Sequence, residues 1–253
     1  MYVEPKPDGR TIVVGDIHGC FDELTRLLSE VGFSPEDVLV SVGDMLDRGP
    51  QSWETARFFR DTPNAGAVLG NHEHRVAGTV LGTSGPAWTQ ELTLSLIPEA
   101  ERREWALWLA ALPAVIETPH CIVTHARLDP AVPLGEQNAR FTSGVRATIE
   151  RDANGVPLWF HEWRGRNPGD SRPVVFGHLT YDRIELVPGA LYAIDTEAPG
   201  GGDLTCAVFP GPSIHSVASQ DYTTPARENW YKAHPRKRDQ KDSARPQPNR
   251  KKA

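Results

Sequence analysis

The stretch TIVVGDIHGC, residues 11–20, joins an apolar run to a polar end. Its β-branched residues predict a short buried strand, which ends at Gly15. Asp16 and His18 follow, separated by one residue and flanked by glycines. A carboxylate and an imidazole at a strand tip, with glycines that permit sharp turns, indicate a pair of metal ligands. Alone the signal is weak, because Gly-Asp pairs are also common in ordinary turns.

Strand and helix signals alternate around this stretch and indicate βαβ units with a parallel sheet. Strands are predicted at 10–16, 37–44 and 66–73, and helices at 21–33, 52–61, 74–82 and 98–112. Later strand signals lie at 114–126 (two short strands), 172–178, 183–187, 190–196 and 203–209, with little helix between them. We therefore expect an α/β fold of two packed sheets with helices on their outer faces.

The chain is expected to form one domain over residues 1–215, followed by a tail. Within the domain, the segment 128–170 is rich in Gly, Pro and Arg and is interpreted as an irregular loop or small cap. Residues 216–253 are interpreted as a basic, disordered tail, since 221–253 holds ten Lys/Arg against four Asp/Glu and few apolar residues. Such a tail could make a weak polyanion contact, although a solubilising tail is the simpler interpretation.

Composition excludes several classes of protein. No apolar run approaches the ~18 residues of a membrane span, and the first residues lack the apolar core of a signal peptide. The odd set Cys20, Cys121 and Cys206 predicts reduced thiols rather than a disulfide framework. We therefore expect a cytoplasmic protein with no membrane partner.

Five predicted strands end in oxygen or nitrogen ligands, and this joint pattern is the strong signal. The residues are Asp16, His18, Asp44, Asn71, His125 and His178. Because parallel strands present their carboxyl ends at the same edge of a sheet, these side chains are expected to meet there. Any one of the histidines alone would more often be structural, whereas five such tips in one order are difficult to reach by chance.

The donor set fits two divalent cations, with Mn²⁺ preferred and Fe, Zn, Co or Ni as alternatives. A carboxylate such as Asp44 can bridge two ions, which together polarise a phosphoryl group. His72 follows Asn71 and could protonate a leaving oxygen. Asp47 could orient that imidazole, and Arg48 could bind phosphate oxygens in a fork.

The segments GDIHG, GDMLDRG and GNHE closely resemble the signature of the metal-dependent phosphoprotein phosphatase family, within the calcineurin-like metallophosphoesterases. Later segments at 125–126, 174–178 and 194–205 resemble further family blocks. The resemblance spans residues 11 to about 209 and implies a four-layer α/β/β/α sandwich with a dinuclear site at the strand ends.

The resemblance also implies a role for each matched residue. Asp16, His18 and His178 would bind one metal, and Asn71 and His125 the other. Asp44 would bridge the two metals. His72 with Asp47 would form the acid pair, and Arg48 a phosphate clamp.

The short chain and its opening motif resemble the bacterial branch, which holds small protein phosphatases and dinucleoside tetraphosphate hydrolases. Three departures concern substrate binding. Arg127 stands where the family often has Gly, and Glu197 also replaces a common Gly. His161 occupies the place of a phosphate-clamping arginine, so Arg127 or Arg164 is the hypothetical substitute.

The preferred function is a phosphomonoesterase of the phosphoserine/phosphothreonine phosphatase type, in which metal-bound hydroxide attacks phosphorus and no phosphoenzyme forms. The alternative is a bis(5'-nucleosyl)-tetraphosphatase, which needs a nucleoside pocket. Aromatic residues of 128–170 could form that pocket, although a small apolar core of the cap is favoured for them. A nucleic-acid end-processing phosphatase and a nonenzymatic metal-binding scaffold are weaker alternatives.

Overall fold

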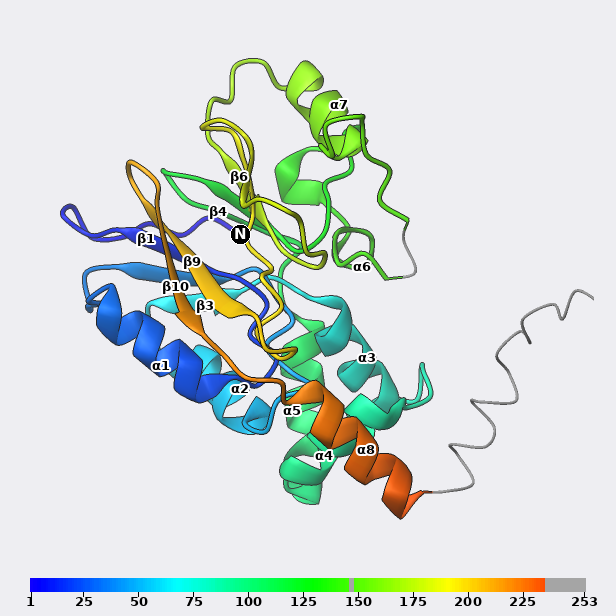
Figure 1. Cartoon of the computed structure of the whole chain (residues 1–253). Helices are drawn as coiled ribbons and strands as arrows, with labels where there is room; N and C mark the ends of the chain where they lie inside the picture. Colours follow the sequence, from blue (N-terminus) through cyan, green and yellow to red (C-terminus); the bar gives the residue numbers. More distant parts are fainter. Residues whose placement is uncertain (146–147, 235–253) are drawn as a thin grey trace, which may run out of the picture.

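The computed structural model describes residues 1–145 and 148–234, which form two five-stranded sheets packed face to face (Figure 1). The first sheet has the order β10-β9-β1-β2-β3 and the second β4-β5-β6-β8-β7. The strands are β1 Thr11–Val14, β2 Val38–Ser41, β3 Ala65–Ala67, β4 Val115–Glu117, β5 Ile122–Thr124, β6 Val174–Phe176, β7 Glu185–Val187, β8 Leu191–Ala193, β9 Asp203–Phe209 and β10 Ser213–Ala218.

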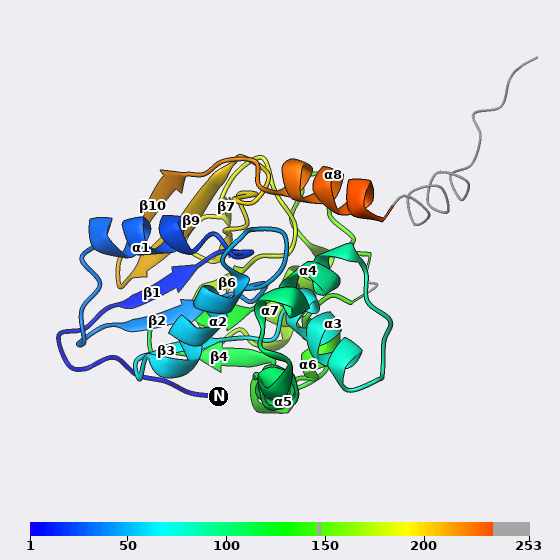
Figure 2. The ribbon, with the colours of Figure 1, turned by 90° about the horizontal axis from the view of Figure 1, so that it is seen from below.

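Helices lie on the outer faces of both sheets, as Figures 1 and 2 show, so the predicted four-layer α/β/β/α architecture is confirmed. The α-helices are α1 Phe21–Glu30, α2 Ser52–Asp61, α3 Asn71–Val80, α4 Trp88–Leu96, α5 Arg102–Ala110, α6 Ala139–Thr142, α7 Leu158–Arg166 and α8 Thr223–Ala233. Two short 3₁₀ turns occupy Glu99–Glu101 and Leu134–Glu136.

Alternation of apolar residues along each strand creates three layers of core. Val13 and Val40 of the first sheet pack against Val123 and Val175 of the second, which fills the space between the sheets. The opposite face of the first sheet packs on the leucines of α1. The opposite face of the second sheet packs on Trp159, Phe160 and Trp163 of α7. These aromatics are therefore the small core of the cap, as the sequence analysis favoured.

The strand register brings the carboxyl ends of three strands to one edge. β1 pairs in parallel with β2 through Thr11↔Val38, and β2 pairs in parallel with β3 through Leu39↔Ala65. The second sheet repeats this arrangement, since β5, β6 and β8 are parallel neighbours. Every polar strand tip that the sequence pattern singled out thus lies at the same end of the sandwich.

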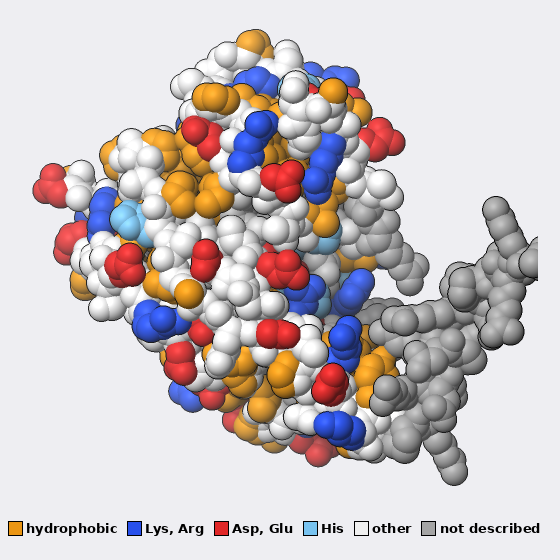
Figure 3. Space-filling view, viewed as in Figure 1, with side chains coloured by type: hydrophobic (Ala, Val, Ile, Leu, Met, Phe, Trp, Pro, Cys, Tyr) orange, Lys and Arg blue, Asp and Glu red, His pale blue; other side chains and the backbone are white. Residues whose placement is uncertain are grey.

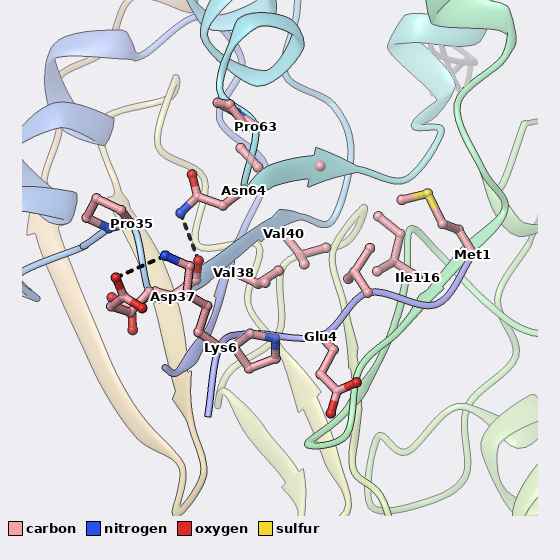
Figure 4. A pocket seen from close by; sticks show the side chains of 15 residues that line it. Met1, Glu4, Lys6, Pro35, Asp37, Val38, Val40, Pro63, Asn64 and Ile116 are labelled. Carbon is pink, nitrogen blue, oxygen red and sulfur yellow. Dashed lines mark hydrogen bonds and ion pairs between the residues drawn. The ribbon is translucent and has the colours of Figure 1, made fainter. Parts of the chain in front are cut away.

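The opposite end of the sandwich holds a cavity of about 350 Å³ (Figure 4). Val38 and Val40 of β2, with Ile116 and Asn64, form part of its wall. The Asn64 amide donates a 2.8 Å hydrogen bond to the Asp37 carbonyl, which ties together the segments that precede β2 and β3. Val40 is the β2 residue of this wall nearest the strand tips, and it precedes Asp44 by four residues, about 13 Å at a strand's rise per residue.

Several predictions about element boundaries were wrong. The strand predicted at 66–73 is β3, which ends at Ala67, and the helix predicted at 74–82 is α3, which already begins at Asn71. Residues 83–97 carried no predicted element but contain α4, which packs against α3. Residues 216–234 were assigned to the disordered tail but form the end of β10 and α8. Trp230 is buried, and the Tyr222 hydroxyl donates a 3.0 Å hydrogen bond to Glu23 Oε1. These aromatic residues make tertiary contacts that order the segment, although its overall composition is basic and mostly polar. The rest of the predicted tail, 235–253, lies outside the described residues.

The described residues contain no helix long and apolar enough to cross a membrane. Cys20, Cys121 and Cys206 are all buried and free, as predicted. Burial raises the pKa of each thiol to about 12, which keeps these cysteines protonated and unreactive.

Asp37 generates a stability prediction. It accepts hydrogen bonds from Nε and Nη2 of Arg10 at 3.1 and 2.8 Å and from Ser34. Burial opposes its ionisation, but these hydrogen bonds prevail and lower the pKa of Asp37 to about 2. Because the folded-state pKa lies below the unfolded value of about 4, the stabilisation is present above pH 4 and is lost as the pH falls toward 2.

We therefore expect Asp37→Asn to lower the free energy of unfolding by about 1–3 kcal/mol at pH 7, measured by urea titration. The difference in the free energy of unfolding between Asp37→Asn and wild type should narrow between about pH 4 and 2. Asp61→Asn, which removes an exposed i,i+4 partner of Arg57, is the matched control and should cost less than about 0.5 kcal/mol. A gap for Asp37→Asn that stays constant down to pH 2 would contradict this assignment.

Candidate metal centre

The strand tips bring the predicted ligands together at the carboxyl edge of both sheets. Asp16 and His18 follow β1, Asp44 follows β2, and Asn71 opens α3. His125 and His178 follow β5 and β6. All six side chains are at least largely buried. Two groups have ligand atoms that lie within 4.8 Å of one another: His18 with Asp44 and His72, and Asp44 with His125 and His178.

Asp44 is the carboxylate common to both groups. Its Oδ2 lies 3.6 Å from His18 Nε2 and its Oδ1 lies 3.5 Å from His125 Nε2. The two carboxylate oxygens therefore face imidazoles that come from different sheets. This is the position that a bridging ligand between two cations requires.

The remaining ring nitrogens fix the tautomers of two histidines. Nδ1 of His18 donates to the Leu46 carbonyl at 2.8 Å, and Nδ1 of His125 donates to the Val42 carbonyl at 2.7 Å. Each Nε2 thereby faces Asp44 and is placed to offer its lone pair to a cation bound there. A metal-binding histidine typically has its other ring nitrogen held in this way, so both imidazoles are orientated as ligands.

His178 differs from its predicted place. The family resemblance grouped it with Asp16 and His18, but its Nδ1 lies 2.8 Å from Asn71 Oδ1, and its ring centroid lies 5.0 Å from that of His125. Only its backbone faces Asp16, to which its N–H donates at 3.1 Å. His178 therefore joins the group of Asn71 and His125, because the chain after β6 turns the imidazole toward α3.

The loops that carry these ligands are strained. Among residues 1–145 and 148–234, six non-glycine residues have positive φ, and five of them are predicted site residues: His18 (48°), Asp44 (50°), Asp47 (73°), Arg48 (70°) and His178 (72°). Non-glycine residues seldom adopt this conformation, and it persists only where the surroundings enforce it. Glycines allow the close approach, since a Cβ on Gly177 would lie 1.9 Å from Asp16 Oδ1.

Glu73 enforces the conformation of the loop after β2. This fully buried carboxylate accepts hydrogen bonds from the N–H groups of Asp44 at 2.7 Å, Leu46 at 3.1 Å and Gly70 at 3.2 Å. Burial, with Asp44 adding, raises the pKa of Glu73 to about 7. Glu73 is thus a positioning residue that joins the start of α3 to the strained loop.

His72 and Asp47 form the predicted pair. His72 Nδ1 lies 2.6 Å from Asp47 Oδ2, and His72 Nε2 lies 4.0 Å from Asp44 Oδ2. Asp47 is in turn held by short hydrogen bonds from Gln90 Nε2 and Thr93 Oγ1 of α4. Burial opposes the charging of His72, but Asp44 and Asp47 prevail and raise the pKa of His72, which favours its proton-donating form.

The buried charges of the site fit divalent cations. Burial, together with Asp195 and Asp44, raises the pKa of Asp16 well above its usual value. Burial likewise raises the pKa of Asp195. Such crowding of carboxylates is relieved by a neighbouring cation, and the mixture of carboxylate, amide oxygen and imidazole suits borderline divalent metals. The residues present therefore fit two cations, without indicating which metal.

The predicted substrate ligands lie in different places. Arg48 is half-buried. It lies near the site, because its charge, after the larger effect of burial, helps to lower the pKa values of His18 and His178. Arg127 stacks on Phe141, with its guanidinium carbon 3.7 Å from the ring centroid, and donates to the Phe141 carbonyl at 3.1 Å.

His161 and Arg164 are bonded within the cap. His161 Nε2 lies 3.0 Å from Asp152 Oδ2, and Arg164 donates to the backbone carbonyls of Asp170 and Arg172. The structure brings neither residue to the metal centre, because α7 uses these side chains to hold its own loops. The alignment of His161 with a phosphate-clamping arginine thus finds no support. Glu197 is exposed, with φ of 60°.

Sequence reasoning missed four supporting residues. Asp195 follows β8 by the same strand-tip pattern, so that pattern could have found it. Glu73 lies within the quoted GNHE segment but received no role. Gln90 and Thr93 gave no signal, because α4 itself was not predicted and their partner Asp47 is 43 and 46 residues away.

The sequence pattern of the calcineurin-like phosphoesterase family matches residues 9–198, which is most of the chain. The protein therefore belongs to the calcineurin-like phosphoesterase family. This confirms the family predicted from the three glycine-containing motifs.

Among curated relatives, a symmetrical bis(5'-nucleosyl)-tetraphosphatase of Vibrio vulnificus is 38% identical over 224 residues, 85% of this chain and 78% of the relative. A protein of the same name from Actinobacillus pleuropneumoniae (serotype 5b) is 32% identical over 171 residues, 61% of this chain and 62% of the relative. The chain thus matches about three fifths of the length of such Actinobacillus relatives.

Solved structures confirm the fold. A candidate diadenosine tetraphosphatase superposes with a TM-score of 0.67 and 33% identity, covering 87% of this chain and 98% of the other. A protein serine/threonine phosphatase from Saccharomyces cerevisiae superposes with a TM-score of 0.60 at 17% identity, covering 87% and 83%. The second likeness, at this identity, concerns the fold alone.

The His72–Asp47 pair generates a prediction. Asp47→Asn should lower kcat for phosphoester hydrolysis about 10- to 100-fold, because the imidazole loses its orienting carboxylate, and should leave the metal content unchanged. Since Asp47 acts through His72, Asp47→Asn should add little to the loss in His72→Asn. Kinetics of the two single variants and the double variant measure this coupling. Independent, multiplying losses would contradict the pair.

Proposed function

We propose that the protein is a metal-dependent dinucleoside tetraphosphate hydrolase that cleaves its substrate symmetrically. The observation that carries this is a 38% identical relative of that name, whose match covers 85% of the chain, together with the metal-binding side chains gathered at the strand tips. The sequence analysis preferred a phosphoprotein phosphatase and kept the tetraphosphatase as its alternative. The names of the relatives favour that alternative, since the protein phosphatase resembles this chain in fold alone.

The reaction breaks the central P–O–P bridge. A water oxygen forms a bond to one inner phosphorus, the bridging P–O bond on that phosphorus breaks, and the departing oxygen leaves on the other half. Two nucleoside diphosphates result. Two divalent cations, when bound by the strand-tip donors, polarise the attacked phosphoryl group and lower the pKa of water.

The residues of the chain have separate tasks in this reaction. Asp16, Asp44, Asn71 and the histidines at the strand tips would hold the cations. His72 carries the proton on Nε2, beside Asp44, and gives it to the departing oxygen. Asp47 holds the His72 ring in place through Nδ1 of that ring, and Arg48 binds non-bridging phosphate oxygens. Glu73 keeps the loop of Asp44 in its strained conformation.

The proposal predicts that purified protein supplied with Mn²⁺ hydrolyses diadenosine tetraphosphate to ADP alone. Mn²⁺ is the first choice for the assay, with Fe, Zn, Co and Ni tested beside it, because the donor set accepts each of them. Chromatography of the products is the measurement. Asp44→Asn should lower the rate at least 10³-fold, since the ligand shared by both cations is lost.

Other products would contradict the proposal in distinct ways. AMP with ATP would mean asymmetrical cleavage. Turnover of a phosphoserine peptide far above the dinucleotide would restore the phosphoprotein phosphatase assignment. Equal activity of Asp44→Asn and wild type would mean that the observed hydrolysis belongs to a contaminant. The cytoplasmic location and a weak polyanion contact through the basic tail, 216–253, stay predictions.

A further inference from the structure

A second cavity, of about 330 Å³, lies between α3, α6 and the end of α5; we call it the α3–α6 cavity. Its apolar wall consists of Leu69, Ala77, Gly78, Leu81, Ala110 and Ala139. Its polar rim consists of His74, Thr83, Asn138 and Arg140. The volume is at the lower limit of the ~300–1,000 Å³ typical of small-molecule sites, which suits one nucleoside rather than a whole dinucleotide.

Both walls of the α3–α6 cavity continue the metal centre. On α3, Asn71, His74 and Gly78 are spaced i, i+3 and i+7 and so share one helix face. The metal ligand and the cavity wall are therefore successive turns of one helix, about 10 Å from end to end. An outer phosphate and a ribose can bridge that distance.

The α6 wall is joined to the centre as well. The Ala126 N–H, next to His125, donates to the Thr142 carbonyl at 2.8 Å. Gly144 lies so close to His178 that a Cβ there would be 2.9 Å from His178 Nε2. The end of the short α6 thus adjoins the segments that carry His125 and His178, and its first residues, Ala139 and Arg140, line the cavity.

The rim of the cavity is cationic. Arg140 is exposed, and within residues 1–145 and 148–234 its guanidinium forms no ion pair or hydrogen bond. None of the described lining residues is acidic. Figure 3 shows Lys/Arg and His side chains, with some Asp/Glu among them, on the face where α6 lies above α3 in Figure 1. The neighbouring cavity beside Arg127, of about 340 Å³, includes Glu150 and Glu162, which oppose a polyphosphate.

We propose that the α3–α6 cavity binds one nucleoside end of the dinucleotide, an inference that rests on the proposed tetraphosphatase function. The base lies against the apolar wall, and Arg140 with His74 contacts the phosphate next to the attacked one. Arg140 is therefore a specificity residue: it contributes to substrates with a second phosphate and a nucleoside, and little to a small monoester.

The test compares two substrates in three variants. Arg140→Gln removes the cation, and Ala110→Phe fills the cavity from an exposed position at the end of α5. Each should lower kcat/KM for diadenosine tetraphosphate about 10- to 100-fold, and this loss should exceed that for p-nitrophenyl phosphate at least fivefold. Arg57→Gln, the matched loss of an exposed arginine on α2, should change neither. Equal losses on both substrates, or no loss in either variant, would overturn the proposal.

An inhibition assay tests nucleoside binding in the cavity independently of dinucleotide hydrolysis. ADP and inorganic phosphate are compared as inhibitors of p-nitrophenyl phosphate hydrolysis. The inhibition constant for ADP should rise at least fivefold in Arg140→Gln and Ala110→Phe, whereas that for phosphate should change less than twofold. If wild type leaves diadenosine tetraphosphate intact, the proposed function fails while this result still decides the cavity. Equal shifts for ADP and phosphate, or none, would contradict a nucleoside site.

Discussion

The hydrogen bonds from the strained loop after β2 to the buried carboxylate of Glu73 are the constraint on which the site depends. Glu73 accepts from the Asp44 and Leu46 N–H groups, which holds Asp44 at a φ of 50°. In this conformation the two oxygens of Asp44 face histidines of both sheets. Without the hydrogen bonds to Glu73, the loop would relax toward ordinary backbone conformations, and Asp44, the carboxylate shared by both ligand groups, would turn away from the histidines.

The same helix serves several purposes. α3 begins with Asn71 and His72, carries Glu73 under the loop, and continues as a wall of the α3–α6 cavity. Ligand, acid, positioning carboxylate and proposed nucleoside contact are therefore arranged along three turns of a single rigid element. A site built on a helix in this way keeps its distances better than one built on independent loops.

Much of the fold and the metal centre could be predicted from the sequence, because both follow from local rules. Short β-branched runs gave the strands, and parallel topology placed Asp16, Asp44 and Asn71 at one edge. The orientation of His178 toward Asn71 could not be predicted, since it depends on a positive φ enforced by packing between distant segments. The contacts of His161 and Arg164 with cap residues, and the hydrogen bond from Gln90 of α4 to Asp47, also depend on tertiary structure. They could not be predicted from the local sequence either. Local patterns specify which residues exist at a strand tip, whereas long-range contacts decide where they point.

The central claim is that Asp44 joins two cation sites at the meeting of the two sheets. The most direct measurement is the metal content per chain of Mn²⁺-loaded protein, by elemental analysis after gel filtration and by anomalous diffraction. We expect two ions in wild type, with one near His18 and one near His125, and at most one ion in Asp44→Asn. Two ions of undiminished affinity in Asp44→Asn, or a single ion in wild type, would contradict a bridging carboxylate.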